Sequence, residues 1–246
     1  MSDVIVVGGG IFGTMHSYFA LRAGLNVTLV ERDPRPLSAS VRNFGMIAVG
    51  GRASGTELQV ALRARELWGQ LASEHQQLTF RPSGSIVVAT NDNHLEVMSE
   101  IAKYPDADQR GWQLVDRYEA LDLNPGLLGR VTGGLYCSQD AVVEPNSVLD
   151  EMRSVMLESA NFRFLSGIEV NSVRQVGQEV QVKVSSGETL AGGHAIVVPG
   201  ADHKTLFAEE FAKAPLRRVF LQMARLEDPG LELTTSIANH DSLRFY

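Results

Sequence analysis

The sequence predicts an α/β fold in which a parallel-sheet domain is interrupted by a second region of mixed α+β character. Three observations lead to this prediction. A β-α-β unit with a glycine-rich turn opens the chain. The next fully apolar strand comes only near residue 196. Between them the pattern changes to short strands and loops, without the regular strand and helix repeat of a continuous parallel sheet.

Composition and charge exclude several classes of protein. The chain has 246 residues, 44% hydrophobic and 21% charged, which is ordinary for a globular protein with a sizeable core. The net charge of −7 argues against a general nucleic-acid binder, which would present a basic face. No stretch approaches the roughly 20 apolar residues of a membrane span, and the N-terminus lacks the pattern of a secretory signal. The single cysteine, Cys137, cannot form an intrachain disulfide, so we expect a cytoplasmic protein.

The first 31 residues predict a strand, a helix and a second strand. Val4–Val7 is a continuous apolar run, as expected for a strand buried on both faces. A helix follows, with an apolar face predicted from Met15, Phe19 and Ala23, with Tyr18 and Leu21 nearby. Gly24 is typical of a helix C-terminus, and Val27–Val30 is a second buried strand that ends at Glu31. This is a β-α-β unit of the usual length.

The turn after the first strand has the spacing Gly8-x-Gly10-x-x-Gly13. Gly8 allows a sharp turn, Gly10 allows a diphosphate to approach the backbone, and Gly13 allows the helix to pack closely on the strand. The free amides and the dipole at the helix N-terminus favour an anion. With a strand before it and a helix after it, the pattern predicts a dinucleotide site.

An acidic residue at the end of the second strand narrows the choice of dinucleotide. Glu31 lies 18 residues after Gly13, near the distance expected for a carboxylate that accepts hydrogen bonds from ribose hydroxyls. The same carboxylate would repel a 2′-phosphate. The expected ligand is therefore FAD or NAD.

The middle of the chain predicts short elements. A helix is expected from Thr56, whose hydroxyl would form a capping box with Gln59. A strand is expected at Gly84–Thr90 and a helical segment at His94–Tyr104. The polar region Tyr104–Gly134 is expected to be mostly loop.

The second half predicts a helix, a hairpin and two further strands. The helix begins near Asn146. Residues 179–184 alternate valine with polar residues, which predicts an antiparallel strand whose hairpin partner begins at Gly187. A separate buried strand is expected at His194–Val198, and a final strand is expected from Leu216.

The order of these elements favours FAD over NAD. A simple NAD dehydrogenase would continue with further β-α repeats, whereas here an inserted region interrupts the nucleotide fold. We expect residues 1–80 and 140–215 to form the FAD-binding, Rossmann-like domain. Residues 81–139 and 216–246 would form the substrate-binding domain. An NAD-dependent dehydrogenase remains an alternative.

Several segments together resemble the FAD-dependent amine and amino-acid oxidoreductases related to D-amino acid oxidase, glycine oxidase and sarcosine oxidase. The likeness runs along nearly the whole chain in the family's order. The segments that carry it are VIVVGGGIFGTMHSYFALRAGLNVTLVER, SASVRNFGM, GGLYCSQDAVVEPNSVLDEM, GIEVNSVRQ and HAIVVPGAD. The stretch SVRNFGM is most similar to a branch proposed to oxidise aminophosphonates.

The resemblance implies that the loop after the second strand passes along the flavin ring. Gly45 would let backbone approach the ring, and Arg42 or Asn43 would donate to flavin heteroatoms. The residues of this loop assigned to the cofactor are Ser40, Val41, Arg42, Asn43, Phe44, Gly45 and Met46. Arg42 could instead meet an anionic group of the substrate.

The resemblance also implies contacts with the rest of the dinucleotide. Val170 would meet adenine through its backbone groups. Gly200 would keep a close approach at the end of the next strand, where Pro199 departs from the family's usual Ala-Thr-Gly. Beside the glycines and the acid, the cofactor site would include Ile11, Phe12 and Arg32.

The chemistry implied by the resemblance is hydride transfer to flavin from a carbon beside an amine, followed by hydrolysis of the imine. The substrate would be a small amine or amino acid. Its acidic head group would bind an arginine, with Arg42 and Arg244 as candidates and Tyr246 as a hydroxyl donor. The scattered histidines show no spacing of metal ligands, so no metal is expected.

Relatives in this family usually continue well beyond the point where this sequence stops, so we expect it to lack the end of the substrate sheet. Unpaired strands left there would favour pairing with a partner. A second class of function therefore stays open: a partial, non-catalytic protein that binds nucleotide or acts only with another polypeptide. The sequence leaves the oligomeric state open.

Overall fold

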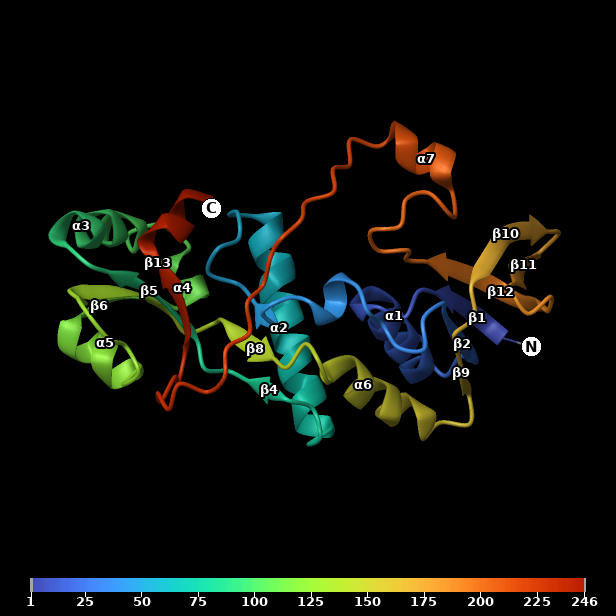
Figure 1. Cartoon of the computed structure of the whole chain (residues 1–246), viewed down its shortest axis with the longest axis horizontal. Coiled ribbons are helices and arrows are strands. Elements are labelled where there is room, and N and C mark those ends of the chain that lie inside the picture. Colours follow the sequence, from blue (N-terminus) through green and yellow to red (C-terminus); the bar gives the residue numbers. More distant parts are fainter. Residues whose placement is uncertain (1, 246) are drawn as a thin grey trace. The chain divides into compact units, whose positions relative to one another are not determined.

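The computed structural model of the chain contains two compact units (Figure 1). It describes residues 2–245, with side chains through residue 243. The first unit comprises 1–43 and 145–223, and the second comprises 44–144 and 224–246. The expected domain boundaries at residues 80, 140 and 215 differ from these limits. Segment 44–80 groups with the second unit because its two short strands pair with a strand of that unit.

The first unit contains a six-stranded sheet in the order β10-β11-β12-β1-β2-β9. The four strands β12, β1, β2 and β9 are parallel, and β10 and β11 extend the sheet as antiparallel strands. The bounds of the strands are β1 Ser2–Val7, β2 Val27–Glu31, β9 Phe162–Ser166, β10 Val170–Val176, β11 Glu179–Val184 and β12 Thr189–Val197. The expected α/β class is confirmed.

Two helices cover one face of this sheet, and side chains of the antiparallel strands pack on the other. Helix α1 (Ile11–Arg22) lies over β1 and β2, and α6 (Val148–Leu157) lies beside it over β9. On the opposite face Ile5, Val7 and Val30 form one core with Val170, Val182, Val184, Leu190 and Leu206. The short helices η1 (Ala39–Val41) and α7 (Ala208–Lys213) complete the unit.

Helix α1 buries only part of the apolar surface that its sequence predicts. Its buried residues are Gly13, Thr14, Ser17 and Tyr18. Phe19, expected to face the core, is 39% exposed. Apart from Tyr18, the buried residues are small, because the helix begins directly above the turn and packs close to β1.

Strand β12 corrects a second expectation. The hairpin partner from Gly187 and the strand His194–Val198 were expected to be separate, but they form one strand of nine residues. Its first part pairs with β11 and its later part pairs with β1, with Gly192 facing both Val180 and Ser2. The change in pattern along the strand therefore reflects a change of neighbours rather than a break.

The second unit contains a four-stranded sheet, β13-β5-β7-β6, and a three-stranded sheet, β3-β8-β4. The bounds of the strands are β3 Met46–Ile47, β4 Phe80–Arg81, β5 Ser85–Ala89, β6 Trp112–Asp116, β7 Gly133–Cys137, β8 Ala141–Val143 and β13 Ser236–Asn239. The helices are α2 Thr56–Glu74, α3 Asp92–Ile101, α4 Ala107–Arg110, α5 Arg117–Leu123 and η2 His240–Phe245.

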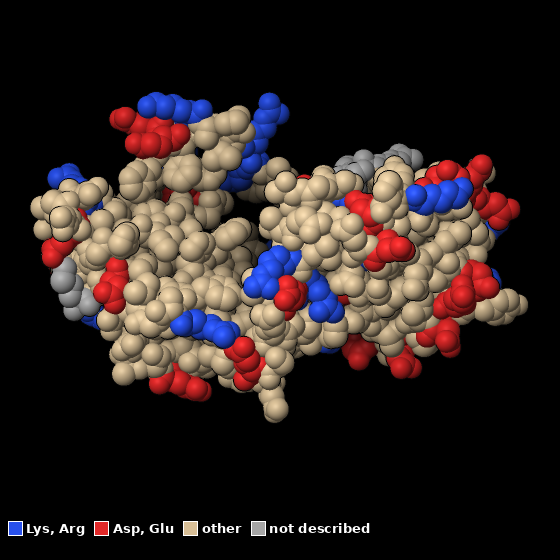
Figure 2. Space-filling view, turned by 180° about the vertical axis from the view of Figure 1, so that it is seen from behind, with Lys and Arg blue, Asp and Glu red and all other residues tan. Residues whose placement is uncertain are grey.

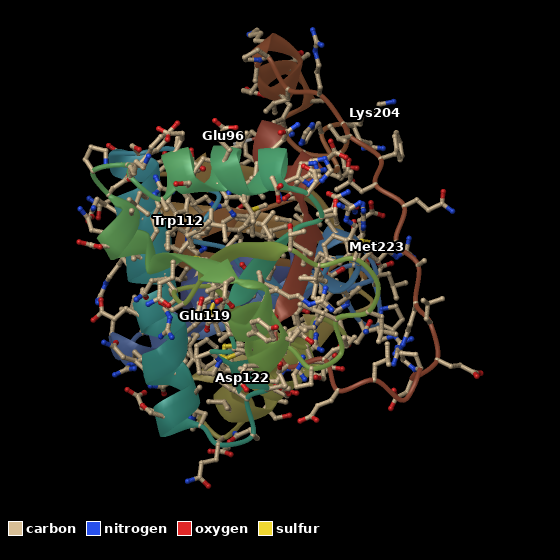
Figure 3. The ribbon with its side chains drawn as sticks, turned by 90° about the vertical axis from the view of Figure 1, so that its left-hand side faces the viewer. Glu96, Trp112, Glu119, Asp122, Lys204 and Met223 are labelled. Carbon is tan, nitrogen blue, oxygen red and sulfur yellow. The ribbon has the colours of Figure 1, made fainter. Side chains whose placement is uncertain are left out.

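Two expectations in this part of the chain are wrong. Thr56 is the first residue of α2 and does not cap it, because Gly55, with φ of 85°, occupies the N-cap position. The region 104–134 holds α4, β6 and α5 rather than mostly loop. Asp116 and Glu119 form a capping box at the start of α5, and Glu119 projects from that helix (Figure 3).

The strand expected from Leu216 is also absent, since the described residues 216–235 form no helix or strand. Most apolar side chains of the run from Leu216 lie in solvent, and Phe220 is 86% exposed. A strand needs a neighbour to pair with its backbone, and β-branched or aromatic residues alone do not supply one.

On the face shown in Figure 2, acidic and basic side chains are mixed. No helix among the described residues has the length and hydrophobicity needed to cross a membrane.

Candidate nucleotide site

The turn between β1 and α1 requires glycine at two positions for steric reasons. Gly8 has φ of 107°, and a Cβ on it would lie 2.4 Å from the carbonyl oxygen of Val198. A Cβ on Gly13 would lie 1.8 Å from the carbonyl oxygen of Gly8. Both obstacles are backbone atoms, which cannot rotate away. The glycines therefore let the first turn of α1 start directly above the end of β1.

The N-terminus of α1 has the properties of an anion site. Gly10 is the N-cap, no acidic side chain lies in the first turn, and Phe12 is 71% exposed. The first amides of a helix have no partner within the helix and carry the positive end of its dipole. Ser40 Oγ accepts a hydrogen bond from the amide of Ile11 at 3.0 Å. A Cβ on Gly10 would lie 3.0 Å from this same oxygen, so Gly10 makes room for Ser40.

The carboxylate of Glu31 ties the end of β2 to the glycine turn. The side chain is buried, with 8% of the residue exposed. Its Oε2 accepts from the amide of Gly9 at 2.6 Å, and its Oε1 accepts from the amide of Asp33 at 3.0 Å. A carboxylate oxygen has two lone pairs, so each oxygen retains the capacity to accept a hydroxyl hydrogen. Glu31 thus shapes the turn and can also bind a ribose.

An ion pair joins the residues that follow β2 and β12. Arg32 Nη1 donates to Asp202 Oδ2 at 2.5 Å, and Asp202 raises the pKa of Arg32. The hydroxyl of Thr205 donates to the same carboxylate at 2.7 Å. Hydrogen bonds from Thr205, from the Lys204 amide and from Arg32 hold the pKa of Asp202 well below its usual range. Arg32 is therefore held at the carboxyl ends of β2 and β12, and about half of its side chain stays exposed to solvent.

The predicted flavin loop is shared between the two units, which meet in sequence between residues 43 and 44. In the first unit, the side-chain amide of Asn43 donates to the carbonyls of Ala39 and Ser40, both at 2.9 Å, and Arg42 is exposed. In the second unit, Phe44 is 76% exposed. Gly45 is buried with φ of 68°, and its carbonyl accepts from the amide of Val143 at 2.9 Å.

The other predicted cofactor residues lie in the first unit. Val170 is the first residue of β10 and is 4% exposed. Gly200 follows β12 with φ of 61°, and the carbonyl of Pro199 accepts from the amide of Asp202. Among the residues of the turn, hydrogen bonds connect Gly9 with Glu31 and Ile11 with Ser40. Tyr246 and the side chain of Arg244 lie outside the described residues.

One buried cation of the first unit was missed by the sequence analysis. Arg153 on α6 is 8% exposed, pairs with Asp150, and places its guanidinium 4.9 Å from the ring centre of Phe164. Burial lowers the pKa of Arg153, whereas the charge of Glu31 acts in the opposite direction. Arg153 lies four residues after Leu149, so it occupies the buried face of α6, and this spacing was readable from the sequence.

The turn, the acid at the end of β2 and the parallel sheet define a dinucleotide-binding protein of the Rossmann-like class. The family model described as DAO, FAD dependent oxidoreductase, matches residues 3–246, and the chain belongs to this family. Its cofactor is accordingly FAD, and the residues of the turn fit this group: the α1 amides suit a diphosphate and Glu31 suits a ribose.

Individual relatives are distant in sequence. A subunit of opine oxidase from Rhizobium meliloti is 22% identical over 227 residues, which is 87% of this chain and 60% of that protein. An N-methyl-L-tryptophan oxidase from Yersinia pestis is 33% identical over 87 residues, or 34% of this chain and 23% of that protein. The chain thus spans less than two thirds of the length of these relatives.

Solved structures show the same fold. Glycine oxidase from Geobacillus kaustophilus superposes with a TM-score of 0.73 at 22% identity, covering 84% of this chain and 57% of that one. An L-alpha-glycerophosphate oxidase from Mycoplasma pneumoniae, solved with FAD bound, gives a TM-score of 0.72 at 18% identity and covers 99% of this chain and 66% of that one.

Proposed function

We propose that this chain carries the FAD-binding part of an oxidoreductase that oxidises the C–N bond of a small amine or amino acid. The observation that carries the proposal is the contact between Glu31 and the Gly9 amide, which fixes the turn below the acid-free N-terminus of α1. The family match supports a flavin. The substrate class is supported by relatives named for amines and amino acids.

In this proposal each part of the chain has one task. The α1 amides bind the diphosphate, Glu31 accepts from the ribose hydroxyls, and the Val170 backbone meets adenine. When bound, FAD would supply the acceptor for a hydride from the carbon beside the substrate nitrogen. The nitrogen loses a proton, and water then hydrolyses the imine to a carbonyl compound and an amine or ammonia. Arg42, exposed on the loop, binds an acidic head group such as a carboxylate or phosphonate.

The alternative function is nucleotide binding without catalysis by this chain alone. It is supported by the name of one relative, which is one subunit of an oxidase. Either function is consistent with a cytoplasmic location, which we propose because the single cysteine, Cys137, is free and buried.

The visible spectrum of the purified chain separates these proposals. An oxidase or dehydrogenase shows oxidised flavin that bleaches when a substrate is added without oxygen. The screen uses glycine, sarcosine, D-amino acids and aminophosphonates, with glycerol 3-phosphate as a substrate that lacks a C–N bond. A protein that binds ADP and FAD but bleaches with none of them supports the second function. Bleaching by glycerol 3-phosphate alone would contradict amine oxidation.

A further inference from the structure

A buried carboxylate in the second unit holds the segment that follows the predicted flavin loop. Asp140, between β7 and β8, is 3% exposed. Its Oδ1 accepts from the amide of Val49 at 2.6 Å and from the amide of Gly50 at 2.9 Å. Its Oδ2 accepts from the hydroxyl of Ser85 at 2.6 Å. The carboxylate thus takes up two consecutive backbone donors of one loop.

A buried guanidinium holds the carbonyls of the same loop. Arg110 is 2% exposed, and its Nη1 donates to the carbonyls of Gly50 at 2.9 Å and Arg52 at 2.7 Å. Its Nη2 donates to Asp106 Oδ2 at 2.8 Å. The guanidinium lies 4.6 Å from the ring centre of Trp112, labelled on β6 in Figure 3. Asp140 therefore binds amides of the segment 49–52, and Arg110 binds carbonyls of the same segment.

The segment 49–52 closely follows residues 44–46, which are predicted to face the flavin. Strand β3 pairs with β8, which begins directly after Asp140, so that Met46 faces Val142. The amide of Val143 also donates to the carbonyl of Gly45 at 2.9 Å. Only Ala48 lies between the end of β3 and Val49, whose amide donates to Asp140. One strand and one carboxylate therefore fix the backbone from residue 45 to residue 50.

Burying the charges of Asp140 and Arg110 costs desolvation free energy, which their hydrogen bonds to the loop must offset. Those hydrogen bonds define one backbone geometry for the loop. We propose that Asp140 and Arg110 are positioning residues, which hold Phe44–Met46 in the conformation that receives the flavin. The inference rests on the proposed function, since it requires this loop to meet FAD. The adenosine half of the cofactor would not depend on the two residues, because its predicted contacts all lie in the first unit.

The test compares the affinity of the full chain for ADP with its affinity for FAD, both measured by titration calorimetry. Asp140→Ala is expected to weaken FAD binding by about tenfold or more, because hydrogen bonds to a charged group are lost. ADP affinity is expected to stay within about twofold of the wild-type value, since the predicted contacts of ADP all lie in the first unit. Asp140→Asn should fall between Asp140→Ala and wild type, because its amide oxygen still accepts from Val49 and Gly50.

Asn124→Ala is the matched control for a general loss of stability in the second unit. Asn124 is fully buried and donates to Thr235 Oγ1 at 2.9 Å, away from residues 44–54. It should change the FAD to ADP affinity ratio by less than about twofold. Hydrogen exchange of the amides of residues 45–50 should accelerate in Asp140→Asn and not in Asn124→Ala, which keeps the test decisive where Asp140→Ala does not fold.

Each outcome separates the inference from the function on which it rests. An unchanged FAD to ADP ratio in Asp140→Asn, with unchanged exchange at residues 45–50, would overturn the positioning role and leave FAD binding intact. An equal loss of ADP and FAD affinity would also overturn it, since the effect would then be global. A wild-type chain that binds ADP but not FAD would overturn the proposed function, and the positioning role with it.

Discussion

Replacement of Glu31 by glutamine tests the link between the glycine turn and the nucleotide. In the structure the carboxylate accepts from the amides of Gly9 at 2.6 Å and Asp33 at 3.0 Å. The glutamine oxygen can keep the first bond without its charge, but its NH2 group would face the Asp33 amide donor to donor. A hydrogen bond to a charged group contributes about 1.5–3 kcal/mol. We therefore expect Glu31→Gln to lower the free energy of unfolding by about 2–4 kcal/mol.

The effect on nucleotide affinity is separate from this loss of stability. Glutamine can accept from one ribose hydroxyl only, so we expect ADP and FAD affinity to fall by about 10- to 100-fold. Urea unfolding measures the change in the free energy of unfolding. Calorimetric titration, at a temperature where the variant is folded, measures the change in nucleotide affinity. The control is Glu188→Gln, since Glu188 is half exposed and 3.9 Å from Arg163, and this variant should change stability by less than about 0.5 kcal/mol. A folded Glu31→Gln protein that binds ADP as wild type does would refute the assignment of Glu31 to the ribose.

Three further predictions follow from single contacts. Gly13→Ala places a Cβ 1.8 Å from the carbonyl oxygen of Gly8, so we expect a loss of more than about 3 kcal/mol in urea unfolding, and a wild-type midpoint would contradict the turn geometry. The guanidinium of Arg110 lowers the pKa of Asp106 from 3.8 to about 2, so the stabilisation is complete above pH 3.8 and is lost as the pH falls towards 2. Asp106→Asn should accordingly lower stability at pH 6 but much less at pH 2, and an equal loss at both values would exclude the ion pair as the cause. Burial raises the pKa of the Cys137 thiol to about 12, so a thiol reagent at pH 8 should modify it only after unfolding, and rapid labelling of the native chain would contradict its burial.

Much of the first unit was predictable because its signals are local. The β-α-β unit lies within 31 contiguous residues, and the positions of Gly8 and Gly13 are imposed by backbone atoms that a motif of fixed spacing encodes. The contact between Gly9 and Glu31 was not predictable in detail. It depends on how the end of β2 lies against the turn, and the sequence shows only that an acid stands at the expected distance.

The errors arose where burial depends on a partner distant in sequence. Phe19 is apolar but 39% exposed, whereas the small residues Gly13, Thr14 and Ser17 are buried together with Tyr18. The apolar run from Leu216 has strand propensity but no neighbouring strand, and propensity without pairing forms no strand. Strand β6 was missed because it lies within a polar region of the chain, although all five of its residues pair with β7.

The predicted flavin loop, residues 40–46, is held in two different ways along its length. Before the boundary at residues 43 and 44, the loop holds itself, because the Asn43 side chain donates to two of its own carbonyls. After the boundary, Phe44 and Met46 are exposed and make no comparable local bonds among the described side chains, so their geometry depends on β8 and Asp140. A ligand that touches only the first unit should be indifferent to Asp140, whereas one that reaches Phe44–Met46 should not. The difference between ADP and FAD affinity therefore measures how well the second half of the loop is held.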